Sequence, residues 1–99
     1  MILISGTVRI STGAIDAVLP SMKRMIDASR AELGCIRYTY AVDVLDDGLI
    51  HVIEAWSDRE ALAAHFQTPH LAEWRSVFSE LGITDRDLRL YETDEGEPV

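Results

Sequence analysis

The segment LIHVIEAW, residues 49–56, limits the possible folds more than any other part of the sequence. Its side chains alternate with a period of two, which is typical of a β-strand. Apolar side chains occupy both faces of this strand: Ile50, Val52 and Trp56 on one, Ile53 and Ala55 on the other. A sheet with two apolar faces is usually covered on both sides. The chain must therefore supply a cover for each face.

The remaining periodicities predict six further elements. They are a strand at 2–10, a helix that ends before Gly34, a strand at 35–44, a helix opened by Ser57 with Glu60 in a capping box, a third helix ended by Gly82, and an extended segment at 83–92. Between them we expect breaks at 11–13 and at Thr68-Pro69, and a hairpin turn at Asp46-Asp47-Gly48. The order β-α-β-β-α-α-β predicts an α+β fold of the ferredoxin-like kind. We expect an antiparallel sheet with its helices on one face.

Helices on one face leave the second face of the sheet bare. A second copy of the chain is the simplest cover for it, so the sequence predicts a homodimer joined through the sheet. The length of 99 residues indicates one domain. We place that domain at residues 1–92 and an acidic tail at residues 93–99.

Composition excludes several classes of function. The net charge is −8 and Lys and Arg form no cluster, which disfavours nucleic-acid binding. The single cysteine, Cys35, excludes an internal disulfide and a multi-cysteine metal site, and we interpret it as a small buried hydrophobe. No apolar run is long enough to span a membrane, and no basic segment precedes the first strand. We therefore predict a cytoplasmic protein with no membrane partner.

His65 is the residue best suited to chemistry, since the sequence holds no phosphate loop and no GxSxG motif. It lies on the apolar side of its helix, beside Phe66. It is either a buried histidine bonded to backbone or to Glu54, or a general base that faces a pocket. His51 is expected at the dimer seam. His70, expected to cap or pack, is five residues from His65 across a helix break, so no shared metal site is predicted.

Four aromatic residues allow two interpretations. Tyr38, Tyr40, Trp56 and Trp74 are residue types that fill cores. The same residue types line pockets for flat aromatic ligands. The sequence pattern by itself leaves both interpretations open.

Several segments together resemble the antibiotic biosynthesis monooxygenase (ABM) domain family. They are Glu32-Leu33-Gly34-Cys35-Ile36-Arg37-Tyr38, Glu54-Ala55-Trp56-Ser57-Asp58, Ala61-Leu62-Ala63-Ala64-His65-Phe66 and Thr68-Pro69-His70. The resemblance extends over roughly residues 1–92 and implies a dimeric α+β barrel, with two ferredoxin-like protomers joined sheet to sheet. Family members include quinol and anthrone oxygenases that need no metal, flavin or haem. Other relatives degrade haem.

The haem-degrading relatives carry an Asn, a Trp and a haem-ligating His in their pocket. Thr7, His65 and Trp74 hold the corresponding places in this chain. The resemblance therefore implies that these three residues line one cavity between sheet and helices. Because Trp74 takes the place of the haem-ligating His of those relatives, the resemblance disfavours axial haem ligation in this chain. We predict neither a cofactor nor a metal.

The resulting hypothesis is cofactor-independent oxygenation of a phenolic or quinol-type aromatic by O₂. His65 would accept the proton or stabilise the anion, Tyr38 and Thr7 would donate hydrogen bonds, and Trp56 and Trp74 would stack on the ring. Two alternatives are a non-catalytic dimer that binds a small aromatic or quinone, and an isomerase or lyase on the same fold.

Overall fold

The structure is a computed structural model that describes residues 1–11 and 13–99. Its elements are β1 (Ile2–Arg9), α1 (Ile15–Arg30), β2 (Cys35–Asp43), β3 (Asp46–Trp56), α2 (Arg59–Phe66), α3 (Pro69–Ser76) and β4 (Thr84–Glu92). The strands form one antiparallel sheet in the order β2-β3-β1-β4. This arrangement confirms the predicted ferredoxin-like α+β fold and element order.

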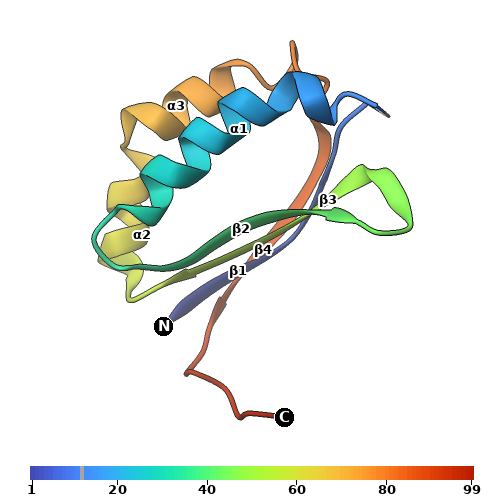
Figure 1. Cartoon of the computed structure of the whole chain (residues 1–99). Helices are drawn as coiled ribbons and strands as arrows, with labels where there is room; N and C mark the ends of the chain where they lie inside the picture. The colour runs from blue at the N-terminus through green and yellow to red at the C-terminus, as the bar shows by residue number, and fades with distance from the viewer. Residues whose placement is uncertain (12) are drawn as a thin grey trace.

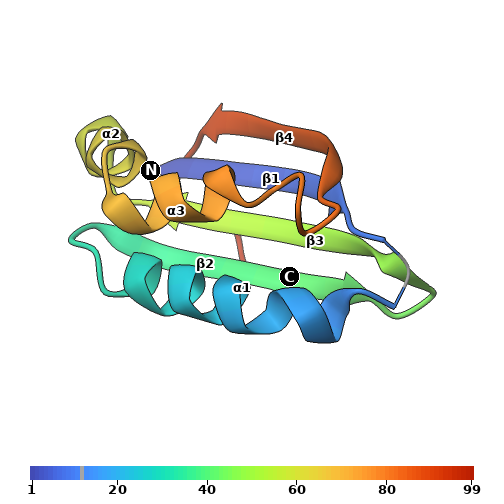
Figure 2. The ribbon, with the colours of Figure 1, turned by 90° about the horizontal axis from the view of Figure 1, so that it is seen from above.

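All three helices lie on the same side of the sheet (Figure 1). Seen from the helix side, α1 runs along β2 and α3 lies beside α1 (Figure 2). Within the part of the chain that the structure describes, no helix covers β4 and none lies on the opposite face of the sheet. Residues 93–99 leave the end of β4 on that side and form neither helix nor strand (Figure 1). The domain boundary at residue 92 stays a prediction.

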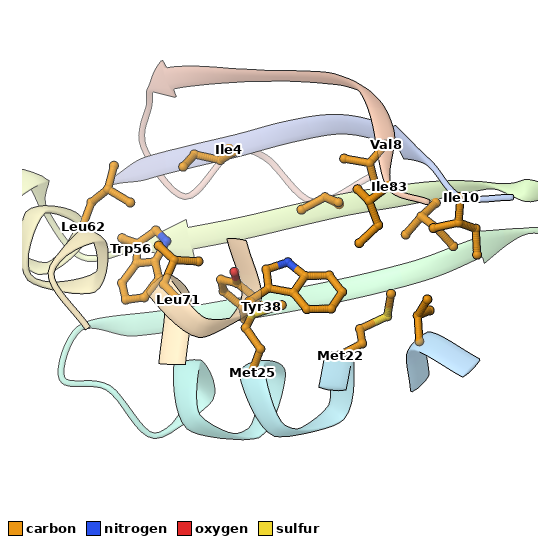
Figure 3. Packing of buried hydrophobic residues seen from close by; sticks show 14 of the residues in the cluster. Ile4, Val8, Ile10, Met22, Met25, Tyr38, Trp56, Leu62, Leu71 and Ile83 are labelled. Carbon is orange, nitrogen blue, oxygen red and sulfur yellow. The ribbon is translucent and has the colours of Figure 1, made fainter. Parts of the chain in front are cut away.

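The core lies between the sheet and the helices. Even-numbered positions of β1 and β3 face the helices, and Ile4, Val8, Ile50 and Val52 are buried there. Figure 3 shows Met22 and Met25 reaching from α1 towards this face of the sheet. The apolar side chains that recur every two residues in the strands therefore pack in one layer against those that recur every three to four residues in the helix.

Three predicted boundaries were wrong. The hairpin turn falls at Val44 and Leu45 rather than at residues 46–48, because the Asp43 carboxylate accepts the Leu45 N–H at 2.8 Å and fixes a tight turn earlier. Asp58, not Ser57, caps α2 and accepts the Ala61 N–H at 2.8 Å. The third helix stops at Ser76, before Gly82. Of the predicted break at 11–13, Thr12 lies outside the described residues.

Gly6 in β1 marks a close approach of two backbones. It pairs with Leu88 of β4, and a Cβ built at Gly6 would lie 2.8 Å from the Leu88 Cα. Only glycine fits there without moving a strand. The first strand thus draws β4 tightly against the sheet along the edge that the helices leave uncovered.

Within the described residues, no helix is both long and apolar enough to cross a membrane.

Candidate functional site

A cavity of about 180 Å³ lies between the sheet and helices α2 and α3. All four strands contribute to it, and so do the two helices and the segment that follows α3. Its lining residues are Ile4, Val8, Tyr38, Tyr40, Glu54, His65, Phe66, Leu71, Trp74, Arg75, Phe78, Ile83, Arg86, Leu88, Arg89 and Leu90. Most of its wall is apolar. An apolar cavity with a few converging polar groups is the usual form of a small-molecule site.

Glu54 is the buried carboxyl group of this cavity. It is only 5% exposed, and its Oε1 accepts the Trp56 indole N–H at 3.0 Å. Burial raises the pKa of Glu54, and the hydrogen bond from Trp56 together with the charges of Arg86 and Arg75 offsets part of that rise. A carboxyl group with a raised pKa beside a cavity is a candidate for proton transfer.

Three neutral donors line the same cavity. Burial raises the pKa of both the Tyr38 and the Tyr40 phenol, so each keeps its proton at neutral pH. The nearby Trp74 indole lowers the pKa of Tyr40 and offsets part of that rise. Trp74 Nε1 is fully buried and has no hydrogen-bond partner among the described residues. Such an atom is an exception that a bound acceptor would explain.

His65 is held by a carboxylate from another part of the chain. Its Nδ1 lies 2.6 Å from Glu32 Oε2, and His70 Nε2 lies 2.8 Å from the same oxygen. An ionised carboxylate only accepts, so each of these imidazole nitrogens donates. His65 is 1% exposed and lines the cavity. Its buried state agrees with the first interpretation, but the partner is Glu32 rather than backbone or Glu54.

The helix break does not keep the two histidines apart, as the spacing of five suggested. Thr68 and Pro69 turn the chain so that His70 meets His65 at Glu32, with ring centroids 6.1 Å apart. The ligand atoms of Glu32, His65 and His70 lie within 4.8 Å of one another, so this group could hold a metal ion. In the structure the three groups satisfy each other by hydrogen bonds instead.

Two predicted ligand contacts lie outside the cavity. Thr7 occupies an odd position of β1, opposite His51 and Asp87 on the helix-free face, because side chains alternate along a strand. Trp56 has no exposed surface and packs against the His65 ring at 4.6 Å between centroids. The cavity is therefore lined by His65, Tyr38 and Trp74, without Thr7 or Trp56. Trp56 contacts the proposed base rather than a ligand.

Sequence reasoning did not place Arg75, Arg86, Glu32 and Tyr40 in the site. Tyr40 and Glu54 lie on the same helix-facing side of the sheet as Tyr38, and the alternation of side chains in the strands could have indicated this. Arg75 and Arg86 are exposed residues from α3 and β4, and their place at one cavity depends on how α3 packs on the sheet, which no local pattern encodes.

His51 and Cys35 take no part in the cavity. His51 lies on the helix-free face, with Nε2 2.7 Å from Asp43 Oδ2, where the dimer seam was predicted. Cys35 is half-buried against the core, and burial raises the pKa of its thiol. A protonated thiol is a weak nucleophile, which agrees with a packing role.

The fold and the cavity together define a small α+β domain with a largely apolar cavity between one sheet and its helices. Residues 1–77 match the model of the antibiotic biosynthesis monooxygenase family, so the chain belongs to that family. An uncharacterised protein of Synechocystis sp. is 28% identical over 94 residues, which cover 95% of this chain and 64% of that protein. The chain thus spans less than two thirds of that relative's length.

Solved structures share this fold. A candidate antibiotic biosynthesis monooxygenase of Deinococcus radiodurans is similar over 100% of this chain and 98% of its own, with a TM-score of 0.90 and 23% identity. Another structure, described as an antibiotic biosynthesis monooxygenase, has a TM-score of 0.79 and 29% identity over 98% of this chain and 100% of its own. PA3566 from Pseudomonas aeruginosa covers 91% of this chain and 87% of its own, with 27% identity and a TM-score of 0.72.

Proposed function

We propose that this protein is a cofactor-independent monooxygenase that oxidises a phenolic or quinol-type aromatic with O₂. The observation that carries the proposal is His65, buried at the cavity wall with Nδ1 bonded to Glu32. Because Nδ1 donates to Glu32, the neutral ring presents Nε2 as an acceptor, and within the described residues Nε2 makes no hydrogen bond. A phenol in the cavity would give its proton to this atom.

The cavity also suits the anion that would result. Tyr38, Tyr40 and Trp74 offer N–H and O–H donors in a largely apolar enclosure. Fixed donors stabilise a developing oxyanion more strongly where water is excluded. These three residues would hold the phenolate, and His65 would keep the proton.

The substrate would be the sole electron donor. The phenolate passes one electron to O₂, the resulting superoxide joins a ring carbon as a peroxide, and the O–O bond then breaks with loss of water. A quinol and O₂ thus give a hydroxylated quinone and water, with one oxygen atom in each product. His65 returns the proton it took, to the departing oxygen.

The test is O₂ uptake with hydroquinone, together with mass analysis of the product made under isotopically labelled O₂. We expect one labelled oxygen in the product, and His65→Gln should slow the reaction about 100-fold or more. His51→Gln is the matched control, because His51 is exposed on the opposite face of the sheet and also bonds a carboxylate. A rate no greater than uncatalysed oxidation, or equal rates in wild type and His65→Gln, would refute the proposal.

Independence from metal can be tested on the same preparation. The group of Glu32, His65 and His70 is the place where a metal ion would bind among the described residues. We expect the purified protein to hold less than one equivalent of any transition metal and to keep its rate in a chelator. Loss of activity on chelation, with recovery on adding one metal, would contradict cofactor independence.

We also propose a homodimer joined through the helix-free face of the sheet. Ile53 lies at the centre of that face, between Ser5 of β1 and Thr39 of β2, and it is half-buried. Light scattering should give the mass of two chains for the wild type and of one chain for Ile53→Glu. Leu19→Glu, on the exposed side of α1, should remain dimeric. A monomeric wild type would contradict the proposal. The cytoplasmic location stays a prediction.

A further inference from the structure

We infer that the substrate of this cavity is a single-ring phenol that carries a carboxylate, rather than a neutral quinol or a larger ring system. The inference rests on the proposed function only in taking the cavity as the substrate site. It depends on three features of the described residues: the cations at the cavity, the charge that remains after pairing, and the size of the enclosed space.

The cations gather at this one site although the chain is strongly acidic. Arg75, Arg86 and Arg89 line the cavity, three of the nine Lys and Arg residues in a chain of net charge −8. Arg89 lies 3.7 Å from Asp87. Among residues 1–11 and 13–99, neither Arg75 nor Arg86 has a carboxylate within 4.0 Å.

The two arginines without a carboxylate partner come from different elements that line the cavity. Arg75 belongs to α3, where its guanidinium carbon lies 5.6 Å from the centre of the Phe66 ring, and Arg86 belongs to β4. Figure 2 shows the uncovered stretch of sheet between these two elements. Guanidinium groups bind carboxylates in pairs of parallel hydrogen bonds. A carboxylate at the solvent-exposed rim of the cavity could be bound by cations from both elements.

The buried Glu54 does not cancel this preference. With Glu54 ionised, Arg75, Arg86 and Glu54 sum to a charge of +1, and with Glu54 protonated they sum to +2. Burial favours the protonated form, because it raises the pKa of Glu54. The carboxylate of Glu32 is already shared by His65 and His70. The cavity therefore stays positive in either state of Glu54.

The enclosed space fits one ring. Its volume is about 180 Å³, and an apolar protein cavity of about 150 Å³ accommodates benzene. Inside, the unpartnered Trp74 N–H and the Tyr40 hydroxyl can donate to a phenol oxygen. The arginines stand where the cavity meets solvent, since both are exposed. A ring with a hydroxyl at one end and a carboxylate at the other matches this arrangement.

The experiment compares the binding of 2,5-dihydroxybenzoate and hydroquinone by calorimetry under nitrogen, where neither is oxidised. We expect the carboxylate compound to bind about tenfold or more tightly, the gain typical of one charge-assisted contact. Arg86→Gln and Arg75→Gln should each remove most of that difference, chiefly by weakening the binding of 2,5-dihydroxybenzoate. Lys23→Gln, which removes the same charge from the exposed side of α1, should keep the difference.

Equal Kd values for the two ligands, a preference that survives both arginine variants, or no binding of either ligand would overturn the inference. Each variant is checked by its melting temperature, which should stay near that of the wild type because both arginines are exposed. The two proposals fail separately. Selective binding of 2,5-dihydroxybenzoate without O₂ uptake would refute the monooxygenase proposal alone. Turnover of hydroquinone without a preference for 2,5-dihydroxybenzoate would refute only the inference that the substrate carries a carboxylate.

Discussion

Replacing Gly6 with Ala tests how tightly β4 is held against β1. The added Cβ would lie 2.8 Å from both the Asp87 carbonyl carbon and the Leu88 Cα, and nearer still to the Asp87 oxygen. Carbon atoms prefer about 3.5–4.0 Å, so the strands would have to part by roughly 1 Å. Overpacking of this kind costs about 1–3 kcal/mol, and the lower entropy of unfolded Ala returns about 0.5–1 kcal/mol.

The middle of these two ranges gives a net loss of about 1–2 kcal/mol. In a domain of this size, each kcal/mol corresponds to roughly 4–8 °C in melting temperature, so Gly6→Ala should melt about 4–16 °C below the wild type. Thermal unfolding followed by circular dichroism measures this shift. Gly96→Ala is the control: a Cβ there would meet nothing within 4 Å, so its cost is limited to the backbone strain of an Ala at φ 77° in the tail, with no clash between strands. Indistinguishable melting of Gly6→Ala and that control would refute the close approach.

Three further predictions concern the cavity. Folding raises the pKa of Glu54 above its ordinary value of 4.5. The protonated Glu54 therefore contributes to the unfolding free energy below pH 4.5, and this contribution is lost as the pH rises towards the raised pKa. Glu54→Gln should thus gain stability relative to wild type as pH rises from about 4.5 to 7 in urea unfolding. Trp74→Phe removes an unpartnered donor, so it should change the unfolding free energy by less than about 1 kcal/mol and weaken hydroquinone binding severalfold. Glu32→Gln should lower kcat about tenfold or more with little change in KM, because it removes the charge that orients His65.

Each of these predictions has a clear contrary result. A constant stability difference between Glu54→Gln and wild type across that pH range would contradict the raised pKa. Unchanged binding in Trp74→Phe would mean that the indole donates to no ligand. A rise in KM with unchanged kcat in Glu32→Gln would assign that carboxylate to substrate binding instead of to the orientation of His65.

The fold was predictable from the sequence because its signals are local. Alternation in 2–10 and 49–56, together with the helical spacing before Gly34, determined which faces meet in the core. The hairpin turn was misplaced because Asp46-Asp47-Gly48 has turn-forming residues, whereas the Asp43 side chain closes the turn two residues earlier. The residue types alone do not show whether the turn forms at Asp46-Asp47-Gly48 or at the position that the Asp43 side chain closes.

The site was only partly predictable, since its members come from distant segments. His65, Tyr38 and Trp74 were expected in the cavity and do line it. The contact between His65 and Glu32 joins residues 33 positions apart, so no spacing rule reveals it. The resemblance implied that Thr7 lines the cavity. The alternation of side chains in residues 2–10 already placed Thr7 on the same face as Leu3, away from the cavity.

The uncovered edge of the sheet connects the fold to the proposed specificity. Within residues 1–11 and 13–99, no helix lies over β4 (Figure 2), so Leu88 and Leu90 form cavity wall instead of buried core. The close contact at Gly6 fixes the distance of β4 from β1, and with it the position of Arg86 relative to Arg75. A strand displaced by about 1 Å would misplace a carboxylate clamp built from both elements, since such contacts weaken steeply with distance and angle. Gly6→Ala protein held below its melting temperature should therefore lose the preference for 2,5-dihydroxybenzoate before it loses hydroquinone binding. Retention of the full preference would show that Arg86 acts independently of the packing of β4.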